Sequence, residues 1–325
     1  MSARGKEAPP LVVIGSANAD IYVEIARLPK EGETIVAKSG HTFPGGKGAN
    51  QAACAARLSH PTYFIGQVGK DGYATLIHDA METAGVRLDY LNKVEAPTGH
   101  AVVMLQPGGQ NSIIVVAGAN NCWPHPENGS KQLHVAVEQL IQRAGAVLLQ
   151  REIPDSVNIE AARIARKENV PVIMDAGGTD APFPEELLEC ITVLSPNETE
   201  LARLTMMPTE TTEQVILAAD KCLEMGVEEV LVKLGEHGSV LVRRGRPPIF
   251  QAAILAPVVI DTTGAGDTFT AAFAVALVEG KVPADALQFA TAAASLCVRS
   301  KGAIPSMPDK RAVKHLLEGA LSDTR

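Results

Sequence analysis

The sequence predicts an α/β fold in three layers: a mostly parallel sheet with helices on both faces, and a small second sheet beside it. Two observations support this prediction. Short apolar runs alternate with longer stretches of helical periodicity along most of the 325 residues, a pattern typical of successive strand–helix units. Two regions break the alternation with strand-like runs that have no helix between them, and these predict the separate sheet.

The main sheet and its helices are predicted from runs that follow one another along the chain. The expected buried strands are residues 11–15, 63–68, 146–150, 170–175, 191–195 and 230–234. The expected helices are residues 48–58, 73–84, 156–167, 212–225 and 268–279. The resulting core is Rossmann-like, and in such sheets ligands bind on loops beyond the carboxyl ends of the strands.

A small sheet is expected to protrude from this core. Residues 19–25 alternate in polarity, and further short strands are expected at 34–38, 99–106 and 112–116, with a Pro-Gly-Gly turn at 107–109. One face of this sheet would cover a site as a lid. The other would pair with a second copy of the chain, because an uncovered apolar sheet favours association. We expect a single α/β domain over 11–310, with lid strands inserted at about 18–43 and 98–118 and terminal extensions at 1–10 and 311–325.

Composition narrows the class of protein. The formal net charge is −8 and no cluster of Lys or Arg stands out, which argues against nucleic acid as a partner. The five cysteines are scattered and form no C-x-x-C pair, as expected for a reduced, intracellular protein. No apolar run has membrane-spanning length, and the first ten residues lack a signal-peptide core. We therefore expect a soluble protein of the cytoplasm, or of the plastid stroma if a transit peptide has been removed.

The run from Asp261 to Asp267 (DTTGAGD) is the strongest chemical signal. An apolar stretch at 253–260, expected to be a strand, precedes it, and a helix-like stretch follows. Gly264, Ala265 and Gly266 would present backbone N–H groups at a helix N-terminus, where an anion is stabilised. Asp267 in the same turn would accept a proton from an attacking hydroxyl, so the run predicts a phosphoryl-transfer site. The alternative is a turn that only caps a helix.

A second glycine-rich run spans residues 43–50 (FPGGKGAN). It is not a P-loop, because that motif needs Gly where the chain has His41 and Ser or Thr where it has Gly48. Its glycines, Gly46 among them, would let the backbone approach a ligand, and Lys47 and Asn50 would donate to hydroxyl groups. The alternative is a plain glycine turn.

Three polar residues follow predicted strands at the expected ligand-binding edge. Asn18 and Asp20 come after the first strand, and Glu152 follows the strand at 146–150. An amide and a carboxylate together suit a polyol, because the carboxylate accepts from adjacent hydroxyls. The alternatives are an Asx turn for the first two residues and a solvated loop acid for Glu152.

Two further post-strand loops are candidates for nucleotide contact. Asn197 and Glu200 are three residues apart on one face of a starting helix, so they would hold water around Mg²⁺ or form a helix capping box, and the two interpretations are compatible. The other loop comprises Lys233, Leu234, Gly235, Glu236, His237 and Gly238. It would contact the nucleotide or simply turn into a hairpin with residues 240–243.

Taken in this order, the motifs resemble those of the ribokinase-like family of carbohydrate kinases. The resemblance runs from about residue 12 to 308, and both glycine-rich signatures of the family are intact. The runs Gly118-Ala119-Asn120 and Lys301-Gly302-Ala303 also fit the family. The resemblance implies ATP-dependent phosphorylation of a small sugar, namely D-ribose at its 5-hydroxyl. Fructose, 2-keto-3-deoxygluconate or a nucleoside such as adenosine remain alternative substrates, and a non-catalytic binding protein on the same scaffold is the alternative class.

The resemblance also implies roles for residues at matching positions. Asp267 would be the base, with the anion hole at Gly264, Ala265 and Gly266. The sugar would be held by Asn18, Asp20, Gly46, Lys47, Asn50 and Glu152. ATP would contact Asn197, the six residues Lys233, Leu234, Gly235, Glu236, His237 and Gly238, and Gly266 and Thr291, and Glu200 would bind Mg²⁺ through water. A K⁺ site would be formed around Asp261, Thr263, Cys297, Ser300, Gly302 and Ser306.

The family resemblance further implies a homodimer joined through the lid sheet. Two features depart from the family pattern or lack a role in it. Thr291 stands where relatives often carry Asn or His, so adenine contacts are expected to differ slightly. The charge of Arg151 has no role in the expected sugar site.

Overall fold

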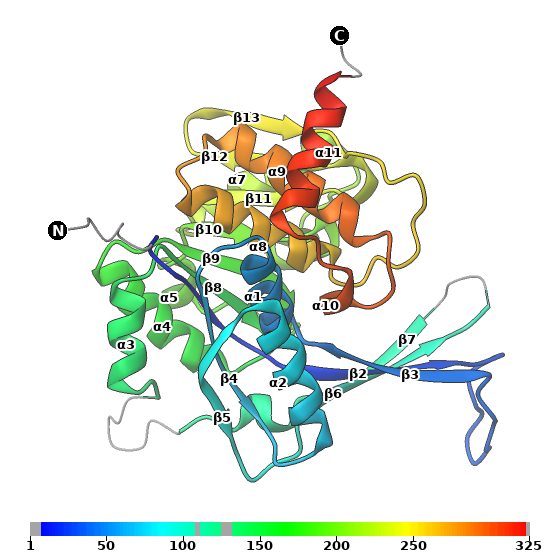
Figure 1. Ribbon diagram of the computed structural model, residues 1–325. Helices are drawn as coiled ribbons and strands as arrows, with labels where there is room; N and C mark the ends of the chain where they lie inside the picture. The colour runs from blue at the N-terminus through cyan, green and yellow to red at the C-terminus, as the bar shows by residue number, and fades with distance from the viewer. Residues whose placement is uncertain (1–7, 108–110, 125–131, 323–325) are drawn as a thin grey trace.

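The central sheet runs through the whole body of the molecule (Figure 1). The computed structural model describes residues 8–107, 111–124 and 132–322. In that part of the chain the sheet has nine strands in the order β13-β12-β11-β10-β9-β8-β1-β4-β5, parallel from β11 to β5, with β12 and β13 antiparallel at one edge. The strands are β1 (Leu11–Ile14), β4 (Thr62–Val68), β5 (Arg87–Lys93), β8 (Ala146–Arg151), β9 (Val172–Gly178), β10 (Val193–Ser195), β11 (Glu229–Lys233), β12 (Ser239–Arg243) and β13 (Arg246–Gln251).

Helices cover both faces of this sheet, as the alternation predicts. Side chains of β1 alternate between two separate hydrophobic cores: Leu11 and Val13 face one, and Val12 and Ile14 face the other. The first core is closed by α1 (Lys47–Arg57), α2 (Gly72–Ala84), α8 (Ala265–Val278), α9 (Pro283–Cys297), α10 (Ala303–Ser306) and α11 (Lys310–Ser322). The second is closed by α3 (Val135–Gln142), α4 (Asp155–Lys167), α5 (Glu185–Leu188), α6 (Glu198–Thr205) and α7 (Thr212–Glu224). The three-layer prediction is confirmed.

The second sheet extends away from the body (Figure 1). Its order is β3-β2-β6-β7, formed by β2 (Asn18–Glu24), β3 (Ser39–Gly45), β6 (Gly99–Leu105) and β7 (Asn111–Val116). This confirms the predicted protruding sheet and three of its strands. The turn expected at 107–109 lies mostly outside the described residues.

The strand expected at 34–38 is wrong. Residues 33–37 form an irregular connection, and the strand that pairs with β2 is β3, in register from Asn18↔Gly45 to Glu24↔Ser39. Val36 is 93% exposed. The β-branched residues of this segment favour a strand, but β2 ends at Glu24, so they have no strand opposite them to pair with.

The strand expected at 253–260 is also wrong. This stretch is irregular, and Leu255, Val258 and Val259 are exposed. Instead of a neighbouring strand, the backbone N–H groups of Ile260 and Asp261 meet the carbonyl of Val298, just beyond α9.

Arg151 acquires a structural role. It is 2% exposed, and its guanidinium donates to the Asp155 carboxylate and to the carbonyls of Ala181 and Pro182. It also lies 4.2 Å from the centre of the Phe183 ring. The residue therefore anchors the loop after β9.

None of the helices in the described ranges combines the length and apolar character needed to cross a lipid bilayer.

Candidate active site

A cavity of about 860 Å³ lies between the second sheet (β3-β2-β6-β7), called the lid sheet from here on, and the end of the central sheet. It is lined by all six residues expected to bind the sugar: Asn18, Asp20, Gly46, Lys47, Asn50 and Glu152. Asp261, Thr263, Gly264 and Asp267 join them from the other side. Segments from both ends of the chain therefore meet in one polar cavity. The expected nucleotide residues Asn197 and Thr291 are not among its lining residues.

Asp267 lies at the bottom of the cavity, in the first turn of α8, and is 6% exposed. Its Oδ2 accepts a hydrogen bond from Asn50 Nδ2 at 2.9 Å, and its Oδ1 accepts one from Gln51 Nε2 at 3.2 Å. Lys47 Nζ lies 3.7 Å from Oδ1. The carboxylate is therefore aimed by the first turn of α1.

Gln51 is a site residue that sequence reasoning missed. It is fully buried, and its side-chain carbonyl accepts from Gln150 Nε2 at 2.8 Å. Both amides are held in the protein interior, which restricts the rotation of Asp267. A Gln inside a predicted helix carries no sign of such a role, and its position next to Asn50 was the only clue.

Gly264 begins α8 as its N-cap with φ of 77°, in the left-handed region. A Cβ there would lie 2.8 Å from Ala303 Cβ, so both the conformation and the packing require glycine. The Ala265 N–H donates to the Thr262 carbonyl at 3.2 Å. In this conformation one of the three expected anion-hole residues is thus already engaged by the turn.

Three hydrogen bonds fix Asn18 and Glu152, two of the residues expected to bind the sugar. Asn18 Oδ1 accepts from Asn120 Nδ2 at 2.7 Å. Glu152 Oε2 accepts from the Ser16 hydroxyl at 2.5 Å and from the Lys47 N–H at 3.2 Å. Glu152 is therefore a fixed site carboxylate and not the solvated loop acid of the alternative interpretation.

Asp20 carries an unusual charge state for a carboxyl group. Burial, followed by the negative charges of Glu152 and Asp267, raises its pKa from 3.8 to about 7. The negative charges of Glu152 and Asp267 thus act on Asp20 within one cavity, and the carboxyl group of Asp20 is partly protonated near neutral pH.

Asp175 is a second site residue that sequence reasoning missed. It ends a predicted strand and is fully buried, with Lys47 Nζ at 3.1 Å and Lys233 Nζ at 2.7 Å from its two oxygens. The same argument that selected Asn18 and Glu152, a polar residue at the carboxyl end of a parallel strand, would have found it.

The residues expected to contact the nucleotide lie on two loops that meet at Lys233. Asn197 and Glu200 form a complete capping box at the start of α6, so the capping interpretation is confirmed. The Lys233 N–H donates to the Pro196 carbonyl at 2.9 Å, which brings the two loops together. The hairpin into β12 is also present.

Thr291 lies on α9, is 6% exposed, and its buried hydroxyl has no hydrogen-bond partner within the described ranges. A buried hydroxyl without a partner is costly unless a ligand satisfies it.

The segments expected to form a K⁺ site also converge. The carboxylate of Asp261 accepts from the N–H groups of Thr263 and Gly302, each at 2.9 Å. Ser306 Oγ lies 3.1 Å from Cys297 Sγ, and the Ser300 N–H donates to the Cys297 carbonyl at 3.4 Å. The lid touches this region, because the Tyr22 hydroxyl donates to Thr263 Oγ1 at 3.0 Å.

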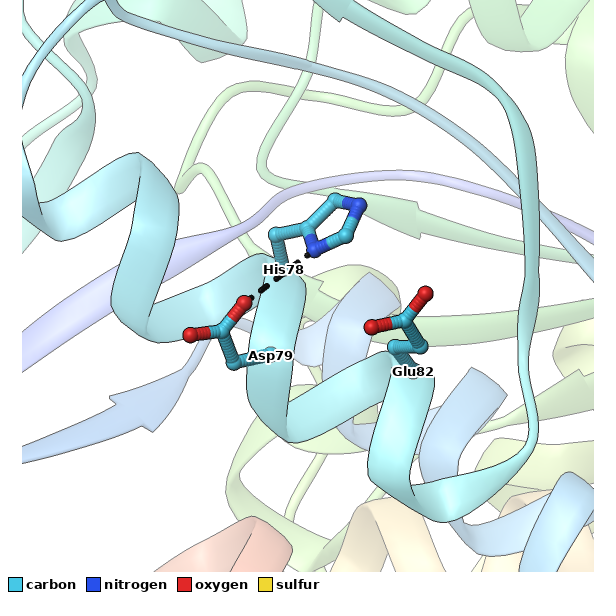
Figure 2. A group of neighbouring side chains, drawn as sticks. All are labelled: His78, Asp79 and Glu82. Atoms are coloured by element: carbon cyan, nitrogen blue, oxygen red, sulfur yellow. Dashed lines mark hydrogen bonds and ion pairs between the residues drawn. The ribbon is translucent and has the colours of Figure 1, made fainter.

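One other group of potential metal ligands occurs in the described ranges, on the surface of α2. Figure 2 shows His78, Asp79 and Glu82, with Asp79 hydrogen-bonded to His78. Asp79 and Glu82 are exposed, and none of the three lines the cavity. The group is best explained as part of a solvated helix face.

Comparison with known proteins decides the family. The sequence profile described as pfkB family carbohydrate kinase matches residues 9–310. The chain belongs to the pfkB family of carbohydrate kinases. The resemblance deduced from the two glycine-rich runs is thereby confirmed.

Individual members of the pfkB family agree with this assignment. A ribokinase of Arabidopsis thaliana is 60% identical over 98% of this chain and 83% of its own length. A ribokinase of Bacillus subtilis is 38% identical over 94% of this chain and 99% of its own length. The solved structure of Arabidopsis thaliana ribokinase complexed with ribose and ATP has a TM-score of 0.91 and 61% identity, covering 96% of this chain and 99% of that chain.

The raised pKa of Asp20 predicts a pH-dependent effect of Asp20→Asn on stability. Folding holds the pKa near 7, above its unfolded value, so the stabilisation from the protonated form is complete below pH 4 and is lost as pH rises through 7. Between pH 4 and pH 8 the free energy of unfolding of the wild type should therefore fall by roughly 2–4 kcal/mol relative to that of the variant. Urea titrations at several pH values measure the difference.

Asp71→Asn is the matched control for this experiment. Partial burial opposes its ionisation, but hydrogen bonds from Thr98 and Ala74 keep the pKa of Asp71 below its usual value. The contribution of the Asp71 carboxylate to stability is therefore complete above pH 4. The difference in free energy of unfolding between Asp71→Asn and the wild type should stay constant from pH 5 to pH 8. A constant difference for Asp20→Asn over the same range would contradict the assignment.

Proposed function

We propose that this chain is an ATP-dependent kinase that phosphorylates D-ribose at its 5-hydroxyl, giving ribose 5-phosphate and ADP. The proposal is supported by extended identity with ribokinases and by close similarity to a structure that holds ribose and ATP. The observation that carries it is the placement of Asp267, which is aimed by Asn50 and Gln51 into a polar cavity at the N-terminus of α8.

In the proposed mechanism Asp267 accepts the proton of the 5-hydroxyl as that oxygen attacks the γ-phosphorus of ATP. Backbone N–H groups at the start of α8, at Gly264, Ala265 and Gly266, stabilise the negative charge on the transferring group. For Ala265 this requires its N–H to leave the Thr262 carbonyl when the phosphates bind.

The remaining sugar hydroxyls would meet the polar wall of the cavity. Asn18, Asp20 and Glu152 offer acceptors, and Lys47 and Asn50 offer donors, all as cavity-lining residues. Closure of the lid over this wall would exclude water and suppress ATP hydrolysis. The contact of Tyr22 with Thr263 already links the lid to the loop before α8.

ATP itself would lie across the two loops that meet at Lys233. Asn197, Gly266 and the residues from Lys233 to Gly238 surround that position, and the unpartnered hydroxyl of Thr291 is a candidate for a contact with adenine. Glu200 would hold Mg²⁺ through water, because Mg²⁺ at nucleotide phosphates keeps much of its hydration shell.

The donor set around Asp261 fits K⁺. It consists of the Asp261 carboxylate, the Ser306 hydroxyl and backbone carbonyls near Thr263, Cys297, Ser300 and Gly302, which are hard oxygen ligands. A bound K⁺ would add positive charge beside the anion hole. The residues themselves brace the turn that leads into α8.

We also infer a homodimer joined through the outer face of the lid. Ile21, Val102 and Ile114 stand opposite one another across β2, β6 and β7. Ile114 is 56% exposed, whereas its neighbours Ile113 and Val115 line the cavity on the other face. A row of apolar side chains on a projecting sheet favours pairing with a second copy.

An intracellular location is supported by the cysteines. All five are free thiols, and Cys54, Cys190, Cys222 and Cys297 are buried. Free thiols persist in reducing compartments. The cytoplasm and the plastid stroma are both compatible with this chemistry.

The proposed substrate and K⁺ site can be tested together. ADP release should be fastest with D-ribose in a panel that includes fructose, 2-keto-3-deoxygluconate and adenosine, and faster in K⁺ than in Na⁺. Adenosine belongs in the panel because the lid wall of the cavity contains Val103, Leu105 and Ile113. Faster turnover of another substrate would overturn the ribose assignment. Equal rates in K⁺ and in Na⁺ would contradict the proposed K⁺ site.

Replacement of the base should abolish turnover without unfolding the protein. Asp267→Asn keeps the size of the side chain but loses the proton acceptor, so kcat should fall by roughly 10²–10⁴-fold. Thermal unfolding and ribose binding by calorimetry measure the fold and the site. Asp285→Asn, an exposed acid in the first turn of α9, is the control and should retain wild-type kcat. Near-normal turnover of Asp267→Asn would exclude it as the base.

The lid interface predicts the effect of Ile114→Asp. A charge in the apolar row should convert a dimer into a monomer, measured by sedimentation velocity at micromolar concentrations. Val135→Asp places the same charge on α3, at a residue that is 57% exposed, and should leave the dimer intact. A monomeric wild type, or a dimer that survives Ile114→Asp, would contradict this interface.

A further inference from the structure

A buried carboxylate joins the two halves of the site. Asp175 is fully buried in the middle of β9, and one oxygen faces Lys47 Nζ at 3.1 Å while the other faces Lys233 Nζ at 2.7 Å. The Gly177 N–H donates to Oδ1 at 3.0 Å, and the Thr270 hydroxyl donates to Oδ2 at 3.3 Å. Each carboxylate oxygen therefore binds one lysine and one neutral donor.

The two lysines come from opposite sides of the proposed reaction centre. Lys47 begins α1 on the sugar side and lies 3.7 Å from the Asp267 carboxylate. Lys233 ends β11 on the nucleotide side, and its Nζ lies 3.8 Å from the position that a Cβ on Gly266 would take. The base and the anion hole thus lie between two ammonium groups that share one counter-ion.

The charge states support a stable arrangement. Although burial opposes ionisation, the attraction of Lys233 and Lys47 holds the pKa of Asp175 well below its usual range. Burial likewise disfavours the Lys47 cation, but Asp175, then Asp267, Glu152 and Glu200, keep its pKa well above its usual value. Asp175 is therefore ionised and Lys47 is protonated at neutral pH.

The Lys47 ammonium lies within reach of two carboxylates, those of Asp175 and Asp267. Its ammonium is closer to Asp175 than to Asp267, by 3.1 Å against 3.7 Å. If Asp175 carried no charge, the Coulombic balance would draw Lys47 onto Asp267. A lysine seated on Asp267 would occupy the oxygen that has to accept the proton of the substrate.

We propose that Asp175 is a positioning residue that holds Lys47 off the Asp267 base. This inference rests on the proposed kinase function, since it assigns Asp175 a part in the same phosphoryl transfer. Asp175 itself lines no part of the cavity and touches no reacting atom. It acts through Lys47.

A purely structural ion pair would behave differently. Breaking it would leave buried lysines without a partner and lower stability, and each folded molecule would still work at the normal rate. The positioning role instead predicts slow turnover in folded molecules. Because one negative charge is removed near the triphosphate, it also predicts ATP binding that is at least as tight as in the wild type.

The test is Asp175→Asn, which keeps the shape of the side chain and an oxygen acceptor. We expect kcat with the sugar substrate, per folded molecule, to fall by about 100-fold, the usual consequence of misplaced reacting groups. We expect no rise in KM for ATP and no loss of affinity for a non-hydrolysable ATP analogue in calorimetry. A normal kcat per folded molecule, or an analogue affinity at least about tenfold weaker, would overturn the proposal.

A double variant tests the route through Lys47. In a Lys47→Met background the lysine cannot reach Asp267, so the further loss of kcat caused by Asp175→Asn should shrink to less than about fivefold. An equal loss in both backgrounds would contradict the role assigned to Lys47. Asp155→Asn, at the structural pair with Arg151, is the matched control and should lower the melting temperature while leaving kcat within about twofold.

The outcomes separate this inference from the function on which it rests. A wild type that phosphorylates no sugar would overturn the proposed function, and the analogue affinity of Asp175→Asn would still test the charge argument. An active wild type with an equally active Asp175→Asn would overturn only the role of Asp175.

Discussion

The structure depends on the buried contact between the Asp267 carboxylate and the first turn of α1. Asp267 belongs to α8 and its partners Asn50 and Gln51 to α1, more than 200 residues earlier in the chain. The two helices also share the hydrophobic core on one face of the central sheet. Helix packing therefore brings the base and its amide donors together, and the hydrogen bonds then set the direction of the carboxylate. Small residues in both helices allow this close approach.

Charge is arranged around that contact in an alternating order. Acids on the sugar side, Asp20 and Glu152, face Asp267 across the cavity, and their mutual repulsion is part of the reason for the raised pKa of Asp20. Lys47 stands between these acids and Asp175, and Lys233 stands beyond Asp175. A site that handles both a polyol and a triphosphate needs this separation, because the acceptors for hydroxyls would repel the phosphates if the two sets were mixed.

Much of the fold was predictable because its signals are local. Alternating apolar runs identified the parallel strands, and glycines at helix starts identified both signature turns. The two wrong strands, at 34–38 and 253–260, show the limit. Both have strand-forming residues, but a strand also needs a neighbour with which to pair, and neither segment has one. Gln51 was missed for a related reason, since its role comes from partners far away in the sequence, whereas Asp175 ends a predicted strand and could have been selected on that ground.

By itself the sequence determined the layering, the two glycine-rich turns and the kinds of side chain at the cavity, because periodicity and motif chemistry are written in neighbouring residues. Only the tertiary structure decided which acid faces which lysine, that Arg151 anchors a loop, and that the Ala265 N–H is held by a turn. The physical reason is that hydrogen bonds and ion pairs depend on distances of a few ångströms between segments. Those distances follow from how helices pack on the sheet, which sequence spacing does not express.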